Sequence, residues 1–296
     1  MRIDEGMMPY LGFETYYRIV RPDVAAPGKA PLVLLHGGPG STHNYFEVLD
    51  EFADRDNRTL VMYDQLGCGQ SFVEGHDELW TYATWDRELI ALREHLGLDR
   101  CHLLGQSWGG MLAIEYLANY QPQGVLSVVL SSTLSSCALW GDEQHRRLRY
   151  LSPQERAAVA LAEETGDYDS PAFRAAEAHF MELFCSDPAS PLDPECIRRP
   201  KRAGRASYLA TQGDNELRPT GIFSTWDYTD RLCEIAQPAL IVSGTQDLCS
   251  PLVAKTMYDR LPHARWELMA GCRHMCFVDD TPRYLDLLQE WLDAHD

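Results

Sequence analysis

The chain has 296 residues, of which 45% are hydrophobic, 10% aromatic and 24% charged, a composition typical of globular proteins and unlike that of disordered or fibrous ones. Its 26 Lys and Arg against 44 Asp and Glu give a formal net charge of −18, which disfavours binding to nucleic acid or to an anionic membrane.

The cysteines and the first residues of the chain indicate the cellular compartment of the protein. The nine cysteines are odd in number and include no CxxC pair, so we expect reduced thiols and no disulfide framework. Residues 1–5 carry two acids and no apolar run follows them, so no secretory signal is predicted. No stretch approaches the ~20 apolar residues of a membrane span. These observations predict a soluble cytoplasmic protein without a membrane partner.

Short apolar runs alternate with helical patterns along most of the chain. The runs predict strands buried on both faces, and the alternation predicts a mainly parallel sheet in an α/β fold. The strands predicted in this way are 31–36, 59–64, 101–106, 126–131 and 239–243, and 265–269 is a last strand candidate. Helices are predicted at 85–96 and 108–120. In the first of these we expect Asp86 and Glu88 to occupy the opening turn, where the helix dipole favours acids.

The alternation stops between residues 135 and 229, where no buried strand is predicted. Ser152, Pro153 and Glu155 form a helix-capping sequence, and Ser170 followed by Pro171 repeats the cap-then-Pro pattern. We therefore predict an α/β core in two parts, 1–134 and 230–296, interrupted by a helical cap at 135–229.

A G-x-S-x-G sequence lies between the third predicted strand and its helix. Gly105 and Gly109 flank Ser107 where any Cβ atom would crowd a sharp strand-to-helix turn. The turn would project Ser107 above the sheet at the amino end of a helix, as a nucleophile requires. The alternative is a Gly-rich turn with a buried Ser, and the strand–helix context favours the nucleophile.

The sequence His36-Gly37-Gly38-Pro39-Gly40 follows the first buried strand. In α/β hydrolases this loop donates one backbone N–H to the reaction's oxyanion, and the residue after the nucleophile donates another. We therefore predict an oxyanion hole formed by the amides of Gly38 and Trp108. A tight turn needing positive φ is the alternative interpretation.

The acid and the histidine of a triad should follow the nucleophile in that order. Asp247 comes directly after one late predicted strand and His274 after the next, in loops where catalytic groups belong. Asp259 and Asp279 are weaker candidates, because the first lies in a helical pattern and the second follows the histidine.

Cysteines also surround the predicted site. Cys272, His274 and Cys276 form a C-x-H-x-C cluster, but alternate ligands without a completing pair are not a usual zinc site, so no metal or organic cofactor is predicted. Cys68 and Cys249 are expected in nearby loops. We therefore hypothesise that bulky thiol reagents inactivate the protein by obstruction, although no cysteine is the nucleophile.

Together these motifs resemble the proline iminopeptidases, serine peptidases of the α/β-hydrolase fold. The similarity rests on HGGPG at 36–40, MYDQLGCGQS at 62–71 and GQSWGG at 105–110, and extends through TLSS, WDYTD and SGTQDLCSP to nearly the whole chain.

This resemblance implies removal of N-terminal proline from short peptides, with Ser107, Asp247 and His274 as the triad. It also implies that Glu216, in the Asn-Glu pair of the cap, binds the substrate's free amine. Some relatives have a second amine-binding Glu directly after the catalytic Asp, where this chain has Leu248. Strict preference for proline over other small residues is therefore left open.

Two other functions remain open at this point. One is an L-amino acid amidase or esterase of the same fold. The other is a non-catalytic, ligand-sensing hydrolase fold, which would not need a complete and correctly ordered triad.

Overall fold

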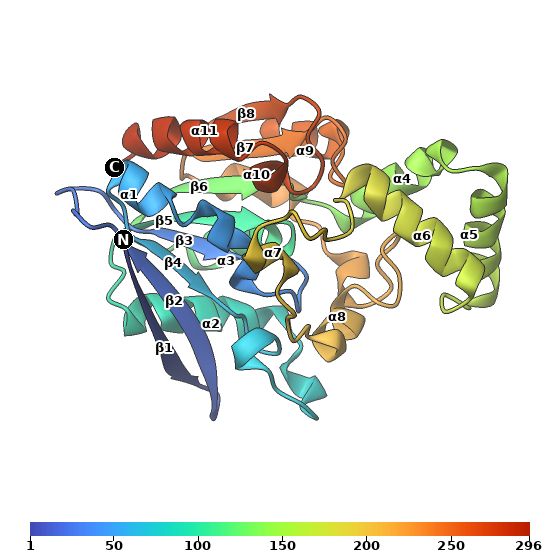
Figure 1. The fold of residues 1–296 in the computed structure, drawn as a ribbon, viewed down its shortest axis with the longest axis horizontal. Helices are drawn as coiled ribbons and strands as arrows, with labels where there is room; N and C mark the ends of the chain where they lie inside the picture. The colour runs from blue at the N-terminus through green and yellow to red at the C-terminus, as the bar shows by residue number, and fades with distance from the viewer.

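A computed structural model describes residues 1–296, and an eight-stranded sheet forms its centre (Figure 1). The strand order is β1-β2-β4-β3-β5-β6-β7-β8. Strands β3 to β8 are parallel to one another, whereas β2 pairs antiparallel with both β1 and β4. The strands are β1 (Arg2–Tyr10), β2 (Phe13–Arg21), β3 (Leu32–Leu35), β4 (Leu60–Tyr63), β5 (Cys101–Gln106), β6 (Val125–Ser131), β7 (Ala239–Gly244) and β8 (Ala264–Met269).

The six predicted strands are confirmed, with bounds that differ by one residue at most. The hairpin of β1 and β2 was not predicted. Most of β1 is exposed or half-buried at the sheet edge, so it lacks the continuous apolar run that marks the buried strands.

Helices cover both faces of the sheet. On one face α2, α3 and α9 pack over alternate strand residues such as Val33 and Leu35, and on the other α1, α10 and α11 pack over Leu32 and Leu34. Strands β3 to β7 are therefore largely buried on both sides, as expected for parallel strands between helical layers. The α-helices of the core are α1 (Phe52–Asp56), α2 (Tyr82–His95), α3 (Trp108–Tyr120), α9 (Pro251–Tyr258), α10 (Cys276–Asp279) and α11 (Thr281–Asp293).

Helix α2 corrects one expectation from the sequence. It begins at Tyr82, three residues before the predicted start, so Asp86 and Glu88 lie beyond its first turn. Both side chains are buried, and burial raises the pKa of each to about 8. These acids are therefore protonation sites within the core and not partners of the helix dipole.

Between β6 and β7 the chain forms helices and no strand. They are α4 (Cys137–Arg147), α5 (Pro153–Thr165), α6 (Pro171–Phe184), α7 (Glu195–Arg198) and α8 (Arg205–Thr211). Helix α5 begins with the predicted capping box of Ser152 and Glu155, and Ser170 caps α6. Short 3-10 helices complete the fold at His43–Leu49, Gly69–Ser71, Asp77–Leu79, Leu148–Tyr150, Ile222–Thr225 and Thr229–Glu234.

Helices α4, α5 and α6 project from the core as a lobe (Figure 1). The lobe has its own small apolar core, which includes Phe173, Phe180 and Phe184. Leu248, from the loop after β7, packs into this core. We propose that the segment 135–229 acts as a cap unit over the sheet. None of the helices has the combination of length and apolar character that crossing a bilayer requires.

Candidate active site

Ser107 lies at the turn between β5 and α3 in a conformation that few non-glycine residues adopt. Its φ and ψ are 55° and −122°, and its side chain is half-buried. A Cβ atom on Gly105 would clash with the carbonyl oxygen of Gly109, and one on Gly109 would clash with that of Leu35. The two glycines thus allow the sharp turn that raises Ser107 above the sheet, as the sequence predicted.

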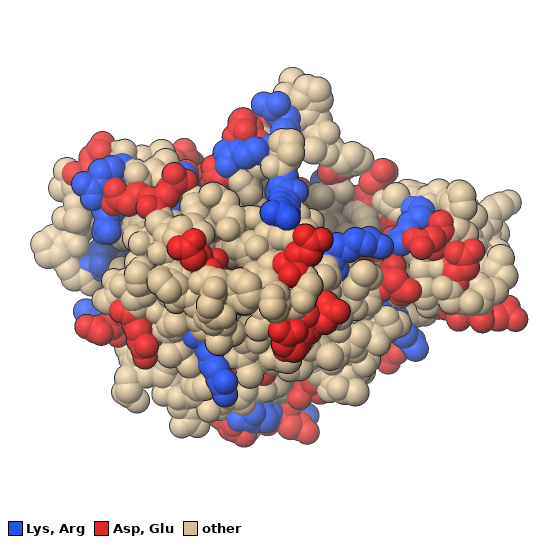
Figure 2. Space-filling model, turned by 90° about the horizontal axis from the view of Figure 1, so that it is seen from below, with Lys and Arg blue, Asp and Glu red and all other residues tan.

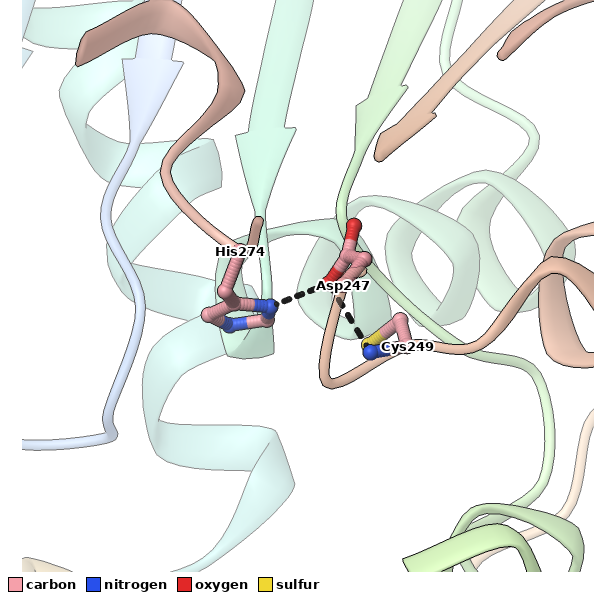
Figure 3. Close-up of side chains that lie close together, drawn as sticks. All are labelled: Asp247, Cys249 and His274. Atoms are coloured by element: carbon pink, nitrogen blue, oxygen red, sulfur yellow. Dashed lines mark hydrogen bonds and ion pairs between the residues drawn. The ribbon is translucent and has the colours of Figure 1, made fainter. Parts of the chain in front are cut away.

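The structure brings Asp247 and His274 together from the loops after β7 and β8 (Figure 3). His274 Nδ1 lies 2.8 Å from Asp247 Oδ1, and Asp247 is fully buried. The same carboxylate accepts hydrogen bonds from the N–H groups of Cys249 at 2.9 Å and Gly244 at 3.2 Å. These contacts fix the carboxylate and leave Nε2 of His274 as the nitrogen available to a substrate or nucleophile. The rival Asp259 instead pairs with Lys255.

The glycine loop after β3 carries the predicted oxyanion donor. Gly38 has φ of +117°, and a Cβ atom there would lie 2.6 Å from the backbone nitrogens of Gly40 and Ser41, so only glycine fits. The N–H groups of Gly38 and Trp108 donate to none of the loop, turn or side-chain acceptors of the protein. Both amides therefore remain available to an oxyanion.

Gln65 holds the glycine loop against the nucleophile turn. Its side-chain oxygen accepts from Trp108 Nε1 at 2.7 Å, and its side-chain nitrogen donates to the carbonyl of His36 at 2.9 Å. The Gln65 backbone N–H also donates to His36 Nε2 at 3.0 Å. Burial lowers the pKa of His36 to about 4, so this histidine is a neutral acceptor and not a base for catalysis.

One cavity of about 650 Å³ joins these groups. Its lining contains five of the six predicted site residues, Gly38, Ser107, Trp108, Glu216 and His274, and Asp247 lies behind His274. The arrangement combines a serine, a histidine oriented by a buried carboxylate, and two free amides. These are the groups that acyl transfer requires.

Comparison with known proteins agrees with this geometry. A family model described as the alpha/beta hydrolase fold matches residues 30–281. Proline iminopeptidases of Clostridioides difficile (strain 630) and Lactobacillus helveticus (strain DPC 4571) are 55% and 54% identical to this chain, each alignment covering 100% of both sequences. The chain belongs to the proline iminopeptidase family. The crystal structure of a Mycobacterium smegmatis proline iminopeptidase superposes with a TM-score of 0.89 at 29% identity, covering 99% of this chain and 98% of that one.

Glu216 reaches the cavity from the loop after α8. Buried Asn215 shapes this loop, because its side-chain oxygen accepts from the N–H groups of Leu217 at 3.0 Å and Arg218 at 2.9 Å. The Glu216 N–H donates to Glu177 at 2.8 Å. Burial, together with the negative charge of Glu177, raises the pKa of Glu216, while the hydroxyl of Tyr208 opposes the rise. Solvent reaches Glu216 through the cavity, but protein surrounds the carboxylate, which favours a cationic ligand.

The cysteines are arranged differently from the expectation. Cys68, Cys272 and Cys276 are buried and do not line the cavity, whereas Cys249 does, and so do Cys137 and Cys185, which the sequence does not indicate. The hypothesis of obstruction by thiol reagents is therefore restricted to the three cysteines that line the cavity.

A different set of possible metal ligands gathers at the site. Asp247, Cys249 and His274 place ligand atoms within 4.8 Å of one another (Figure 3), and neither Cys272 nor Cys276 belongs to the group. The Cys249 thiol donates to the carbonyl of Ser132 at 3.3 Å, and burial raises its pKa well above the ordinary value. A neutral thiol and a hydrogen-bonded Asp–His pair suit proton transfer better than metal ligation.

Proposed function

We propose that this chain is a serine aminopeptidase that releases N-terminal proline from short peptides through an acyl-enzyme intermediate. The observation that carries the proposal is the single cavity that holds Ser107, the hydrogen-bonded His274 and the acidic Glu216. The nine free thiols suit a reducing compartment, so we propose that the protein acts in the cytoplasm.

In the proposed reaction His274 Nε2 accepts the proton of Ser107 as its oxygen attacks the carbonyl carbon of the N-terminal residue. Asp247 holds the imidazole and stabilises the imidazolium that forms. The amides of Gly38 and Trp108 stabilise the oxyanion, each by about 3–4 kcal/mol. His274 then protonates the leaving amine, and an ester of proline remains on Ser107. Water, deprotonated by His274, hydrolyses that ester and restores the serine.

Glu216 would hold the secondary ammonium of the N-terminal proline. A peptide segment without a free amine would leave this carboxylate buried and unpaired, which costs binding energy. The pairing therefore restricts cleavage to the first residue of a peptide. Leu248 supplies an apolar wall, because it lines the same cavity and is buried.

The proposal is tested with Ser107→Ala and proline arylamide as substrate. We expect kcat/KM to fall by a factor of roughly 10⁴ or more, because the nucleophile is lost, and covalent labelling by a phosphonate to disappear. Ser224→Ala is the matched control, since Ser224 is exposed and bonds to the nearby carbonyl of Gly221. Undiminished turnover by Ser107→Ala would refute the assignment. Hydrolysis of simple esters alone by the unmodified protein would refute the peptidase activity.

A further inference from the structure

Lys201 is a cation in the cavity without a carboxylate partner. The chain has three lysines, and the other two, Lys29 and Lys255, each form ion pairs with carboxylates. Lys201 forms none, although the chain carries a net charge of −18. An unpaired ammonium in a cavity of so acidic a protein points to a ligand that supplies the missing anion.

Lys201 lies close to the oxyanion loop. Its ammonium lies 5.5 Å from the centre of the Tyr45 ring. The Tyr45 hydroxyl accepts from the Gly37 N–H at 2.5 Å and donates to Gln106 at 2.9 Å. The chain following Lys201 is held by a hydrogen bond from Gly204 N–H to the Gly40 carbonyl at 2.8 Å. Lys201 is therefore presented beside the loop that carries the oxyanion donor.

The ammonium is also partly desolvated. Solvent reaches the exposed side chain through the cavity, but the surrounding protein lowers the pKa of Lys201 by burial. Arg205 lines the same cavity and also has no ion pair or side-chain hydrogen bond. Figure 2 shows the surface hollowed between the core and the helical lobe, with Lys and Arg side chains beside the hollow.

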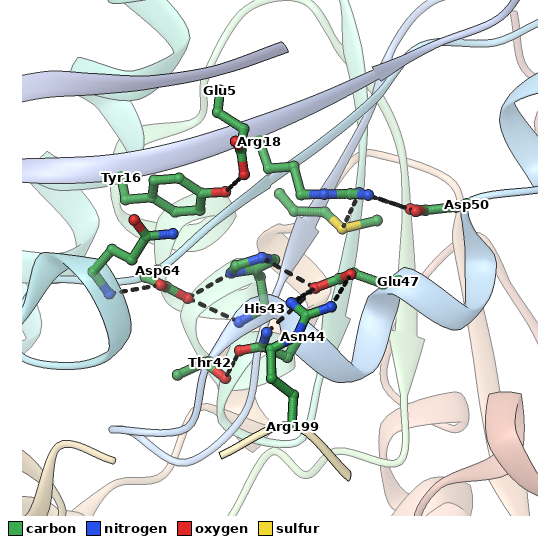
Figure 4. A network of polar contacts seen from close by, with 12 residues as sticks. Glu5, Tyr16, Arg18, Thr42, His43, Asn44, Glu47, Asp50, Asp64 and Arg199 are labelled. Atoms are coloured by element: carbon green, nitrogen blue, oxygen red, sulfur yellow. Dashed lines mark hydrogen bonds and ion pairs between the residues drawn. The ribbon is translucent and has the colours of Figure 1, made fainter. Parts of the chain in front are cut away.

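Two neighbouring arginines, Arg18 and Arg199, are by contrast paired with carboxylates (Figure 4). A second cavity beside Lys201 is lined by Arg18, which pairs with Asp50 at 2.6 Å, and by the Arg199–Glu47 pair at 2.9 Å. Those cations have carboxylates within the protein and need no ligand. Lys201 borders both cavities and takes no part in this network.

Lys201 and Glu216 lie in one cavity but do not neutralise each other. Asp64 is the carboxylate whose charge acts on Lys201, whereas Glu177, His274 and Arg174 are the charged groups that act on Glu216. The cavity therefore offers a negative and a positive site at separate places. A short free peptide is a zwitterion with the complementary charges at its two ends.

We propose that Lys201, assisted by Arg205, binds the C-terminal carboxylate of short peptides whose N-terminal amine is held by Glu216. This inference rests on the proposed aminopeptidase function and adds a preference for peptide length. An extended chain advances about 3.3–3.6 Å per residue, so the carboxylate reaches a fixed cation only in peptides of a particular small length. Longer peptides carry their carboxylate beyond the cavity.

The test compares matched substrates within each variant. For Pro-Gly, Pro-Gly-Gly and Pro-Gly-Gly-Gly, kcat/KM is measured for the free acid and for the C-terminal amide, with proline arylamide as the reference for aminopeptidase activity. The acid-to-amide ratio cancels differences in folding or active concentration. We expect the unmodified protein to prefer the acid by roughly tenfold at one of the two shorter lengths, as for one charged hydrogen bond.

Three variants complete the test. We expect Lys201→Gln to bring the acid-to-amide ratio close to one, and Lys201→Arg to retain the preference. Lys255→Gln, the same change at a lysine outside the cavity, should keep the wild-type ratio. Equal turnover of acids and amides by a protein that cleaves proline arylamide would overturn the carboxylate site alone. Failure to cleave any prolyl substrate would overturn the proposed function and this inference with it.

Discussion

At the scale of single residues, the proposed role of Glu216 in binding the substrate's amine can be tested directly. We expect Glu216→Gln to lower kcat/KM for proline arylamide by roughly 10- to 100-fold, mainly through KM, because a charged hydrogen bond worth about 1.5–3 kcal/mol is lost. Burial raises the pKa of Glu216, so the carboxylate takes up its proton at a higher pH than an ordinary Glu. Wild-type kcat/KM should therefore fall as the pH is lowered through that raised pKa, and the variant should lack this contribution.

The matched control is Glu164→Gln, since Glu164 is exposed on α5 and outside the cavity. It should leave both KM and the pH profile unchanged. An unaltered KM in Glu216→Gln would mean that another group binds the amine.

The sequence was sufficient to single out the residues of the proposed triad and oxyanion hole, because each lies in a motif or directly after a strand. It was insufficient for residues that act through tertiary contacts. Gln65 lies inside a recognisable motif, yet its role depends on touching Trp108 and His36 from a third loop. Lys201 belongs to no motif, and only the folded chain shows that it lacks a carboxylate partner.

At the scale of elements, the end of α6 connects the cap to both catalytic loops. The carbonyl of Phe184 accepts from the N–H groups of Leu248 and His274, each at 3.1 Å. The Phe184 ring is buried in the cap's apolar core, with the Arg147 guanidinium 4.6 Å from its centre. Arg147 in turn donates to the carbonyl of Asp247. The packing of the cap therefore helps to position the acid and the histidine.

We expect Phe184→Ala to lower the free energy of unfolding by about 3 kcal/mol, as for other buried phenylalanines, and to lower kcat because the end of α6 shifts. Urea unfolding and kcat for proline arylamide measure the two effects. Leu161→Ala, at a side chain on α5 that is 60% exposed, should change neither. A destabilised variant with wild-type kcat would show that cap packing and the positioning of His274 are independent.

The elements themselves were predictable to different degrees. Strands that lie between two helical layers are buried on both faces, so each appears in the sequence as a continuous stretch of mostly apolar residues. The hairpin β1–β2 has one strand at the sheet edge with mixed burial, and no such run marks it. The sequence predicts too late a start for α2, because Asp86 and Glu88 resemble acids of a first helical turn, whereas tertiary packing buries them.

At the scale of the whole molecule, the buried acids Asp86 and Glu88 make the free energy of unfolding depend on pH. Burial raises the pKa of Asp86 from 3.8 to about 8, and one oxygen of its carboxyl group has no hydrogen-bond partner. Between pH 4 and 8 the folded protein therefore keeps a proton that the unfolded chain has lost. The free energy of unfolding should fall as the pH rises through this interval, by at most about 1.4 kcal/mol per pH unit for this group.

Asp86→Asn removes this protonation site without changing the side chain's shape. We expect its free energy of unfolding, measured by urea denaturation at pH 5, 6.5 and 8, to fall less steeply with pH than that of the wild type. Asp99→Asn makes the same substitution at an exposed position, so it controls for the general repulsion in a chain of charge −18. If Asp86→Asn and Asp99→Asn showed the same slope, the pH dependence would arise from overall charge, and Asp86 would be ionised in the folded core at neutral pH.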